Sequence, residues 1–401
     1  MINQSRASSH INSDSRFLLQ VCIGTLCRLV LVTARRLIYP FAPSLSRNLG
    51  ISLESVTFII AANQITAITG IFLGPIADRL GYRLMMLIGM FLLVVGMVTA
   101  GFWPIYVVIL VGFFLAGLGR SLFDPALQAY VSERVPYNRR GLFISATEFS
   151  YAGATLIGIP LLAVVIGNWG WKPLFFIMGI AGLIGLLSVT LLIDQEKKQD
   201  RKPNIFSAFK QTYRQLFTSR TALGMLGYSF FMTFANDNLF VVYGVWLESR
   251  FNLSIVSLGM GTIAIGMAEL AGSSIAAFFS DRVGLKRAVI WGTIATILCY
   301  SFLPFLDQFL LSTLCGIFML FLIFEFTFVI GISLSTEVLP AVRATMMAGF
   351  YATTGIGRVI GAVTGMSVWM FGKLTATVLM STILTMLALA VLLWGLKGKR
   401  F

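Results

Sequence analysis

The chain has 401 residues, of which 57% are hydrophobic and only 11% are charged. Soluble domains carry about 25% charged residues, so this composition excludes a water-soluble globular protein. The formal net charge is +14, yet the cations are placed as membrane topology requires and not as on a nucleic-acid-binding surface.

The first half of the chain contains six apolar runs long enough to cross a membrane. A helix needs about 20 apolar residues to span about 30 Å of hydrocarbon. After a polar N-terminal tail, 1–16, these runs lie near 17–43, 55–77, 84–102, 105–132, 142–167 and 174–193. Six membrane crossings return the chain to the side on which it started.

A polar, basic segment, 194–220, separates these runs from a second set of six. Its apolar residues between Ile205 and Phe217 recur at helical spacing, which predicts an amphipathic helix on the membrane surface. The later runs lie near 221–247, 254–279, 288–306, 309–336, 344–370 and 375–396, before a basic tail, 397–401. We therefore predict an all-α membrane protein of twelve transmembrane helices in two pseudo-symmetric six-helix lobes, 17–193 and 221–396.

The positions of the cations predict the orientation of the chain. With a cytoplasmic N-terminus, 21 of the 30 cations lie in cytoplasmic segments and five lie inside spans. Only Arg47, Lys172, Arg250 and Lys373 fall on the opposite side. Lys and Arg concentrate in cytoplasmic loops of membrane proteins, so we expect a multi-pass monomer of the bacterial inner membrane with both termini in the cytoplasm.

The sequence lacks the residue patterns of an enzyme or a metal site. Its four cysteines lie in apolar runs without metal-ligand spacing, and its single histidine, His10, lies in the polar tail. No G-x-x-x-x-G-K-[ST] phosphate loop is present. We expect no cofactor, no metal, no nucleic-acid partner and no enzymatic activity.

The two halves share a repeat at a constant offset of 203 residues. GPIADRLGYR at 74–83 matches AFFSDRVGLK at 277–286. The offset relates Asp78 to Asp281, Arg79 to Arg282, Gly81 to Gly284, Arg83 to Lys286, Arg140 to Arg343 and Gly158 to Gly361. Internal repeats around a central site are the usual plan of secondary transporters.

The segment GPIADRLGYR resembles the loop signature of the major facilitator superfamily, G-x-x-x-D-R-x-G-R-R, and the resemblance covers essentially the whole chain. It implies a secondary transporter in which loop charges latch one conformation. We expect Arg83 to pair with Glu133, and Lys286 with Glu337. The expected latch comprises Gly74, Asp78, Arg79, Gly81, Arg83, Glu133, Asp281, Arg282, Gly284, Lys286 and Glu337. The alternative is that these charges only set topology and loop shape.

The fifth span contains SYAGATLIGIP, which resembles the glycine and proline signature of drug and metabolite antiporters. Gly153, Gly158 and Pro160 occupy its characteristic positions. The resemblance implies proton-coupled efflux. The alternative is a packing role, in which small residues let helices five and eight approach closely.

Ten ionisable side chains lie inside the spans. Each costs about 2.5–3.5 kcal/mol on insertion scales and should therefore face a cavity or a partner. In the superfamily that the chain resembles, helices one, four, seven and ten line the central cavity, and seven of the ten lie there. We assign Arg28, Arg35, Arg36, Asn63, Gln64, Asp237, Glu325 and Arg358 to a substrate cavity. We assign Arg120, Asp124, Glu148 and Glu269 to proton coupling.

Spacing and height in the membrane suggest pairs among these charges. Arg120 and Asp124 are four residues apart on one helical face and can neutralise each other. Glu148 lies at a similar depth, so two acids near one arginine form a candidate proton site. Arg35 or Arg36 is expected to form a gate between the lobes with Asp237; the alternatives are pairing within a lobe and a substrate contact.

The membrane charges give the first lobe a net charge of +2 and the second a net charge of −2. This polarity favours an amphipathic ligand. The preferred function is proton-coupled export of an amphipathic organic compound by alternating access, with the substrate, protons and the lipid bilayer as partners. Proton symport of an organic anion, lipid or lysolipid translocation, and a non-transporting receptor remain alternatives.

Overall fold

The computed structural model describes residues 2–135, 140–194, 216–339 and 343–398; within them, the side chains of 2–15, 70–79, 132, 140–142, 144–146, 148, 279–283, 343–345 and 348 are outside the description. The described residues are almost entirely helical and contain no strand. The predicted amphipathic helix of the linker lies outside them.

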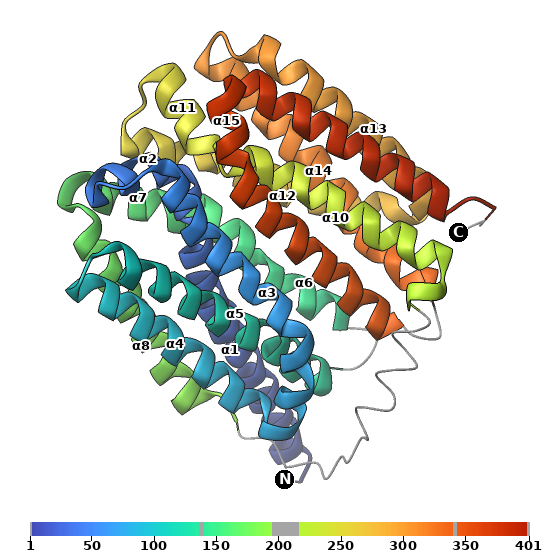
Figure 1. Cartoon of the computed structure of the whole chain (residues 1–401). Coiled ribbons are helices and arrows are strands. Elements are labelled where there is room, and N and C mark those ends of the chain that lie inside the picture. Colours follow the sequence, from blue (N-terminus) through green and yellow to red (C-terminus); the bar gives the residue numbers. More distant parts are fainter. Residues whose placement is uncertain (1, 136–139, 195–215, 340–342, 399–401) are drawn as a thin grey trace.

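The first lobe contains the helices α1 (Ile2–Arg36), α2 (Ile38–Leu49), α3 (Leu53–Leu80), α4 (Tyr82–Phe102), α5 (Tyr106–Arg134), α6 (Arg140–Gly153), α7 (Ile159–Trp169) and α8 (Trp171–Leu192). The second contains α10 (Arg220–Phe240), α11 (Tyr243–Phe251), α12 (Ile255–Val283), α13 (Leu285–Phe302), α14 (Leu310–Val338) and α15 (Arg343–Gly395). The two groups form separate bundles (Figure 1).

These helices make twelve membrane spans, as the sequence predicted. Nine helices in the described part of the chain are long and apolar enough to cross a membrane. One of these, Gly349–Gly395, contains two spans because the backbone leaves the helical region at Gly372 and Lys373. The helices α3 and α10 supply the remaining two.

The first span of each lobe bends near its middle. Helix α1 ends at Arg36 and α2 begins at Ile38, with Pro40 in its first turn; proline lacks the N–H that would continue the preceding helix. The equivalent span breaks between α10 and α11. The bends place Arg35, Arg36 and Asp237 beside interruptions of the helical backbone.

The bundles meet at the end of the molecule that carries α2, α7 and α11, and both chain ends lie away from it (Figure 1). Here the backbones of the two lobes come into direct contact. A Cβ added to Gly244 on α11 would lie 2.2 Å from the carbonyl oxygen of Pro40 on α2. The structure is therefore closed at the α2/α11 end.

The 203-residue repeat is visible in the turns. Gly81 (φ +92°) joins α3 to α4, and Gly284 (φ +82°) joins α12 to α13. The next helix of each lobe is held in the same way: Arg83 donates to the carbonyl of Thr190 at the end of α8, and Lys286 Nζ donates to the carbonyl of Leu396 (3.0 Å) just after α15.

Alanine at either turn glycine should destabilise the protein, because L side chains rarely adopt this backbone conformation. We expect Gly81→Ala and Gly284→Ala each to lower the free energy of unfolding by about 1–3 kcal/mol. Thermal unfolding in detergent measures the change. Gly355→Ala is the matched control: that glycine is helical, its new Cβ would lie 3.5 Å from its nearest neighbour, and helical Gly→Ala stabilises by about 0.5–1 kcal/mol. Equal stability of all three variants would contradict the expectation.

The expected Arg83–Glu133 pair is wrong. Tyr82 donates its hydroxyl to Glu133 Oε1 (2.9 Å), while Arg83 contacts Thr190. Consecutive helical residues point about 100° apart, so Tyr82 faces α5 and its neighbour faces α8. The Lys286–Glu337 pair stays a prediction. The side chains of Asp78, Arg79, Asp281 and Arg282, and the packing at Gly74, lie outside the described residues, and the latch therefore stays a prediction as well.

Gly153 and Gly158 lie on the fifth span, which comprises α6 and α7, and they pack against α1 and not against the eighth span, α12. Added Cβ atoms at Gly153 and Gly158 would meet Leu29 and Thr33. A π-helical turn, Ala154–Gly158, precedes the buried Pro160, which cannot donate to the residue four positions earlier. Helices five and eight do pack closely, but through glycines of α12: Gly259 against Ala163 and Gly266 against Leu156.

Candidate functional site

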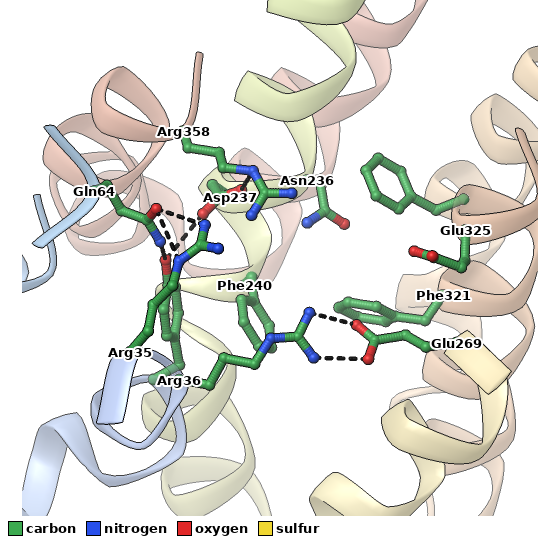
Figure 2. A pocket seen from close by; sticks show the side chains of 12 residues that line it. Arg35, Arg36, Gln64, Asn236, Asp237, Phe240, Glu269, Phe321, Glu325 and Arg358 are labelled. Atoms are coloured by element: carbon green, nitrogen blue, oxygen red, sulfur yellow. Dashed lines mark hydrogen bonds and ion pairs between the residues drawn. The ribbon is translucent and has the colours of Figure 1, made fainter. Parts of the chain in front are cut away.

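A small polar cavity lies between the lobes, beside the bends of α1 and α10 (Figure 2). It is lined by Arg35, Arg36, Tyr39, Gln64, Asn236, Asp237, Phe240, Glu269, Phe321, Phe324, Glu325 and Arg358. Its volume is about 30 Å³, which is enough for ordered water but not for an organic molecule. The lobes are thus nearly closed around the charges.

A two-pronged ion pair joins the lobes across this cavity. Arg36, the last residue of α1, donates Nη1 to Glu269 Oε2 (2.7 Å) and Nη2 to Oε1 (2.8 Å) on α12. The side chains are only 13% and 10% exposed. Paired hydrogen bonds between guanidinium and carboxylate are stronger and more directional than neutral ones. This contact is the strongest polar link between the lobes in the described residues.

A second polar chain crosses the interface beside it. Arg35 donates Nε (3.1 Å) and Nη2 (2.6 Å) to Gln64 Oε1, and Gln64 Nε2 donates to the Tyr39 hydroxyl (2.6 Å). That hydroxyl donates to Asp237 Oδ1 (3.0 Å). Arg358, from the same lobe as Asp237, has its Nε 3.9 Å from Oδ2. Asp237 is thus held by a tyrosine from the first lobe and an arginine from its own.

The expected gate partner is therefore wrong, although a gate-like pair exists. Arg36 bonds to Glu269, and Arg35 bonds to an amide. Arg36 and Asp237 lie at similar heights along their helices, which suggested a pair. Which residue Arg36 contacts, however, depends on the rotation of its helix about the helix axis. Arg36 faces α12, and Tyr39 takes the place opposite Asp237.

Another charged cluster lies inside the first lobe. Asp124 accepts a hydrogen bond from Arg28 Nε (3.2 Å) and forms an ion pair with Arg120, whose Nε lies 3.1 Å away. The expected pair with Arg120 is thus present, and a second arginine joins it. Tyr151 accepts a hydrogen bond from Arg120. The guanidinium carbons of Arg28, Arg36 and Arg120 lie 5.1, 5.3 and 5.4 Å from its ring centroid, within cation–π range.

This cluster does not line the cavity, and no residue of α5 does. Arg28 was expected at the cavity, and the structure places it on Asp124 instead. The assignment of Arg120 and Asp124 to proton coupling stays a prediction. The side chain of Glu148 lies outside the described residues, so its part in a proton site stays a prediction. Asn63 is also away from the cavity: its Nδ2 donates to the carbonyl of Phe113 (2.7 Å) and ties α3 to α5.

The outer rim of the interface carries one more ion pair between the lobes. Arg47 on α2 donates Nη2 to Glu248 Oε1 on α11 at 2.6 Å. Its side chains are 61% and 21% exposed, and exposed pairs contribute only about 0–1 kcal/mol. The Arg47–Glu248 pair therefore lies at the closed end but contributes little to the stability of the closed state.

Sequence reasoning found six cavity residues as such, Arg35, Arg36, Gln64, Asp237, Glu325 and Arg358, and placed Glu269 in proton coupling. It missed Tyr39, Asn236, Phe240, Phe321 and Phe324. Asn236 was detectable as a second polar residue beside Asp237 within an apolar helix. The phenylalanines were not, because the chain has 34 of them. In the described part of the chain, no cluster of His, Cys, Asp and Glu could hold a metal ion.

The comparisons with known proteins agree with this architecture. Residues 24–268 match the family model of the Major Facilitator Superfamily. The chain is similar to "Uncharacterized MFS-type transporter YceJ" of Bacillus subtilis (24% identity, covering 89% of this chain and 92% of that protein). It is also similar to "Multidrug resistance protein MdtG" of Escherichia coli (25% identity, 65% and 66%).

A solved structure shows the same fold. The crystal structure of a D-xylose-proton symporter superposes with a TM-score of 0.77 at 18% identity, covering 96% of this chain and 100% of that one. The family match spans more than half of the chain, and the fold, the spans and the repeat accord with it. The chain belongs to the major facilitator superfamily and is a membrane transporter, not an enzyme.

Proposed function

We propose that this transporter exports an amphipathic organic compound in exchange for protons. The observation that carries the proposal is the buried Arg36–Glu269 pair, which places a titratable carboxylate at the contact between the lobes. The cavity combines charged groups with aromatic side chains, as an amphipathic cargo requires. Similarity to multidrug resistance proteins supports export.

Protonation of Glu269 would act directly on the lobe interface. A neutral carboxyl no longer balances Arg36, and removing one charge of a buried pair costs about 3–5 kcal/mol. Such a cost changes a two-state equilibrium by a factor of at least about 100. One proton at one side chain is thus sufficient to release the lobes.

The proposed cycle uses this pair as a lock. With both termini in the cytoplasm and the chain in the bacterial inner membrane, the α2/α11 end faces outward, and the structure is closed to the outside. The unprotonated, empty carrier is locked there by Arg36 and Glu269. Cargo entering from the cytoplasm displaces the pair and lets the lobes open outward. After the cargo leaves, Glu269 takes up a proton from outside. When the lobes close again, Arg36 returns to Glu269 and drives this proton off toward the cytoplasm.

Uptake of an organic anion with a proton is the second candidate. Arg35 has no carboxylate within ion-pair distance among the residues that the structure describes, and its guanidinium bonds to Gln64. An arginine paired only with an amide retains its full positive charge. Direction of proton movement separates the two candidates: export consumes the proton gradient by antiport, whereas uptake moves cargo and proton the same way.

Glu269→Gln should uncouple cargo from protons. In proteoliposomes with a luminal pH dye, we expect cargo-driven proton flux to fall at least about tenfold, because the glutamine keeps the shape but carries no titratable charge. Tryptophan, tryptophan amide and indolepropionate serve as amphipathic test cargoes of different charge. Exchange of labelled cargo across the membrane, which needs no net proton movement, should fall less than the cargo-driven proton flux.

Glu248→Gln is the matched control for this experiment. It makes the same chemical change at the exposed pair between the lobes and should leave proton flux within about twofold of wild type. Proton flux in Glu269→Gln equal to that in wild type would reject Glu269 as the coupling group. No cargo-driven flux in wild-type liposomes would reject proton coupling itself.

A further inference from the structure

The charges of the cavity fall into two groups of opposite sign. On one side lie Arg35 and Arg358 with Asp237, a net charge of +1; we call this the cationic group. On the other side lie Glu269 and Glu325 with Arg36, a net charge of −1; we call this the acidic group. Figure 2 shows them facing each other, with Phe240 between them.

The cationic group includes a hydrogen-bond donor that is not satisfied. Arg358 Nε is buried and has no hydrogen-bond partner in the described part of the chain, since Asp237 Oδ2 lies 3.9 Å away. Arg35 is fixed by Gln64, so its positive charge is positioned without being neutralised. A buried donor without a partner costs about 1–3 kcal/mol. An incoming carboxylate or similar anion would remove that cost.

An aromatic wall connects the two groups. Phe240 stacks on Tyr39 with ring centroids 4.3 Å apart, and its edge meets Phe321 at 5.5 Å. Phe324 lines the same cavity. A ligand that reaches from one charged group to the other would lay an apolar body along these rings.

The Arg36–Glu269 pair determines which ligand charges can stabilise the parted lobes. Opening the lobes separates Arg36 from Glu269 and leaves two buried charges without partners, at about 3–5 kcal/mol for either one. A cationic ligand can balance Glu269 but leaves Arg36 unbalanced. An anionic ligand does the reverse. A ligand with one charge of each sign balances both.

We propose that the cargo is a zwitterionic aromatic compound, whose anionic group binds Arg35 and Arg358, whose cationic group binds Glu269 and Glu325, and whose apolar body lies on the phenylalanines. This inference rests on the proposed function, in which this cavity is the transport site. The present volume of about 30 Å³ excludes such a ligand, so binding requires the lobes to part. Arg36 directly follows Arg35 on α1, so we place the same anionic group on Arg36 once the other lobe carries Glu269 away.

Binding to the purified transporter in detergent tests the inference. The probes are tryptophan, tryptophan amide and indolepropionate, which share an indole and carry both charges, only the positive and only the negative. A ligand that binds the native state raises its apparent thermal stability. We expect tryptophan to bind at least about tenfold more tightly than either of the other two, which corresponds to about 1.4 kcal/mol.

Two variants assign the ends of the ligand. Glu325→Gln should lower the affinity for tryptophan and for tryptophan amide about tenfold and leave the affinity for indolepropionate unchanged. Arg358→Gln should lower the affinity for tryptophan and for indolepropionate about tenfold and leave the affinity for tryptophan amide unchanged. Glu248→Gln, at the outer rim, should change none of the three. The opposite dependence in the first two variants cannot come from a general loss of folding.

Several outcomes would overturn the inference. One is that tryptophan amide or indolepropionate binds as tightly as tryptophan; another is that none of the probes stabilises the protein. Because binding in detergent needs no proton gradient, its result is separate from the proposed coupling. A preserved order of affinities with no proton flux would overturn coupling alone, and proton flux with a monovalent cargo favoured would overturn the zwitterion alone.

Discussion

Reversing one charge of the Arg36–Glu269 pair should reduce transport at least about a hundredfold, and reversing both should restore it to at least about a tenth of the wild-type rate. In Arg36→Glu or Glu269→Arg, two like charges face each other in a nearly closed, 10–13% exposed contact. Breaking a buried pair costs about 3–5 kcal/mol, and each 1.4 kcal/mol changes an equilibrium or a rate tenfold. Initial rates of labelled-cargo exchange in proteoliposomes measure the loss.

The double variant Arg36→Glu/Glu269→Arg re-forms the pair with its charges exchanged, and we expect at least a tenth of wild-type exchange. The outer pair is the control: Arg47→Glu and Glu248→Arg change an exposed contact, worth about 0–1 kcal/mol, and should lower the rate less than about fivefold. If the double variant is as inactive as the single ones, the two residues do not act as a lock.

The fold was predictable from the sequence because its causes are local. Twenty-residue apolar runs require spans, and the repeat of GPIADRLGYR as AFFSDRVGLK requires two related lobes. The repeat relates Gly81 to Gly284, and both have positive φ in the turns where the structure places them. The bends after Arg36 and Phe240 were not predicted, since both spans read as continuous apolar runs.

The site was predictable in composition but not in pairing. The cost of burying charge in a membrane indicated which side chains would gather, and Arg35, Arg36 and Glu269 all line the cavity. Pairing depends on the rotation of each helix about its axis, where an error of one residue turns a side chain by about 100°. Arg35 or Arg36 was therefore assigned to Asp237, while the structure places Arg36 on Glu269 and Arg35 on Gln64.

The same limit explains the charges of the first lobe. Arg120 and Asp124 lie on one helix, so their spacing alone indicated the contact. Arg28 comes from another helix, and nothing in the sequence placed it on Asp124. Because Arg28 contacts Asp124 and does not line the cavity, Arg35 and Arg36 are the cations of α1 that face the other lobe. The opposite net charges of the two lobes were thus predictable from the sequence, but the positions of the individual charged side chains were not.

The closed end of the interface depends on the absence of one side chain. A Cβ at Gly244 would lie 2.2 Å from the carbonyl oxygen and 2.6 Å from the carbonyl carbon of Pro40, and 2.8 Å from the oxygen of Tyr39. These are backbone atoms of α2, which cannot rotate out of the way. Gly244→Ala should therefore hold the lobes apart at this end, since overpacking costs about 1–3 kcal/mol, a shift of about fivefold to a hundredfold in the closed population.

Cross-linking across the rim measures that population. Cysteines replacing Arg47 and Glu248, whose side chains touch at 2.6 Å in the closed structure, should be linked by a short bifunctional reagent at least about fivefold more slowly when Gly244→Ala is added. Gly355→Ala makes the same change at another contact between the lobes, where the new Cβ would lie 3.5 Å from Ala67 and 3.7 Å from Ile68. Because that methyl group fits, cross-linking should match the parent. Equal rates in both glycine variants would show that the approach of α2 and α11 does not limit closure, and the lock would then rest on Arg36 and Glu269 alone.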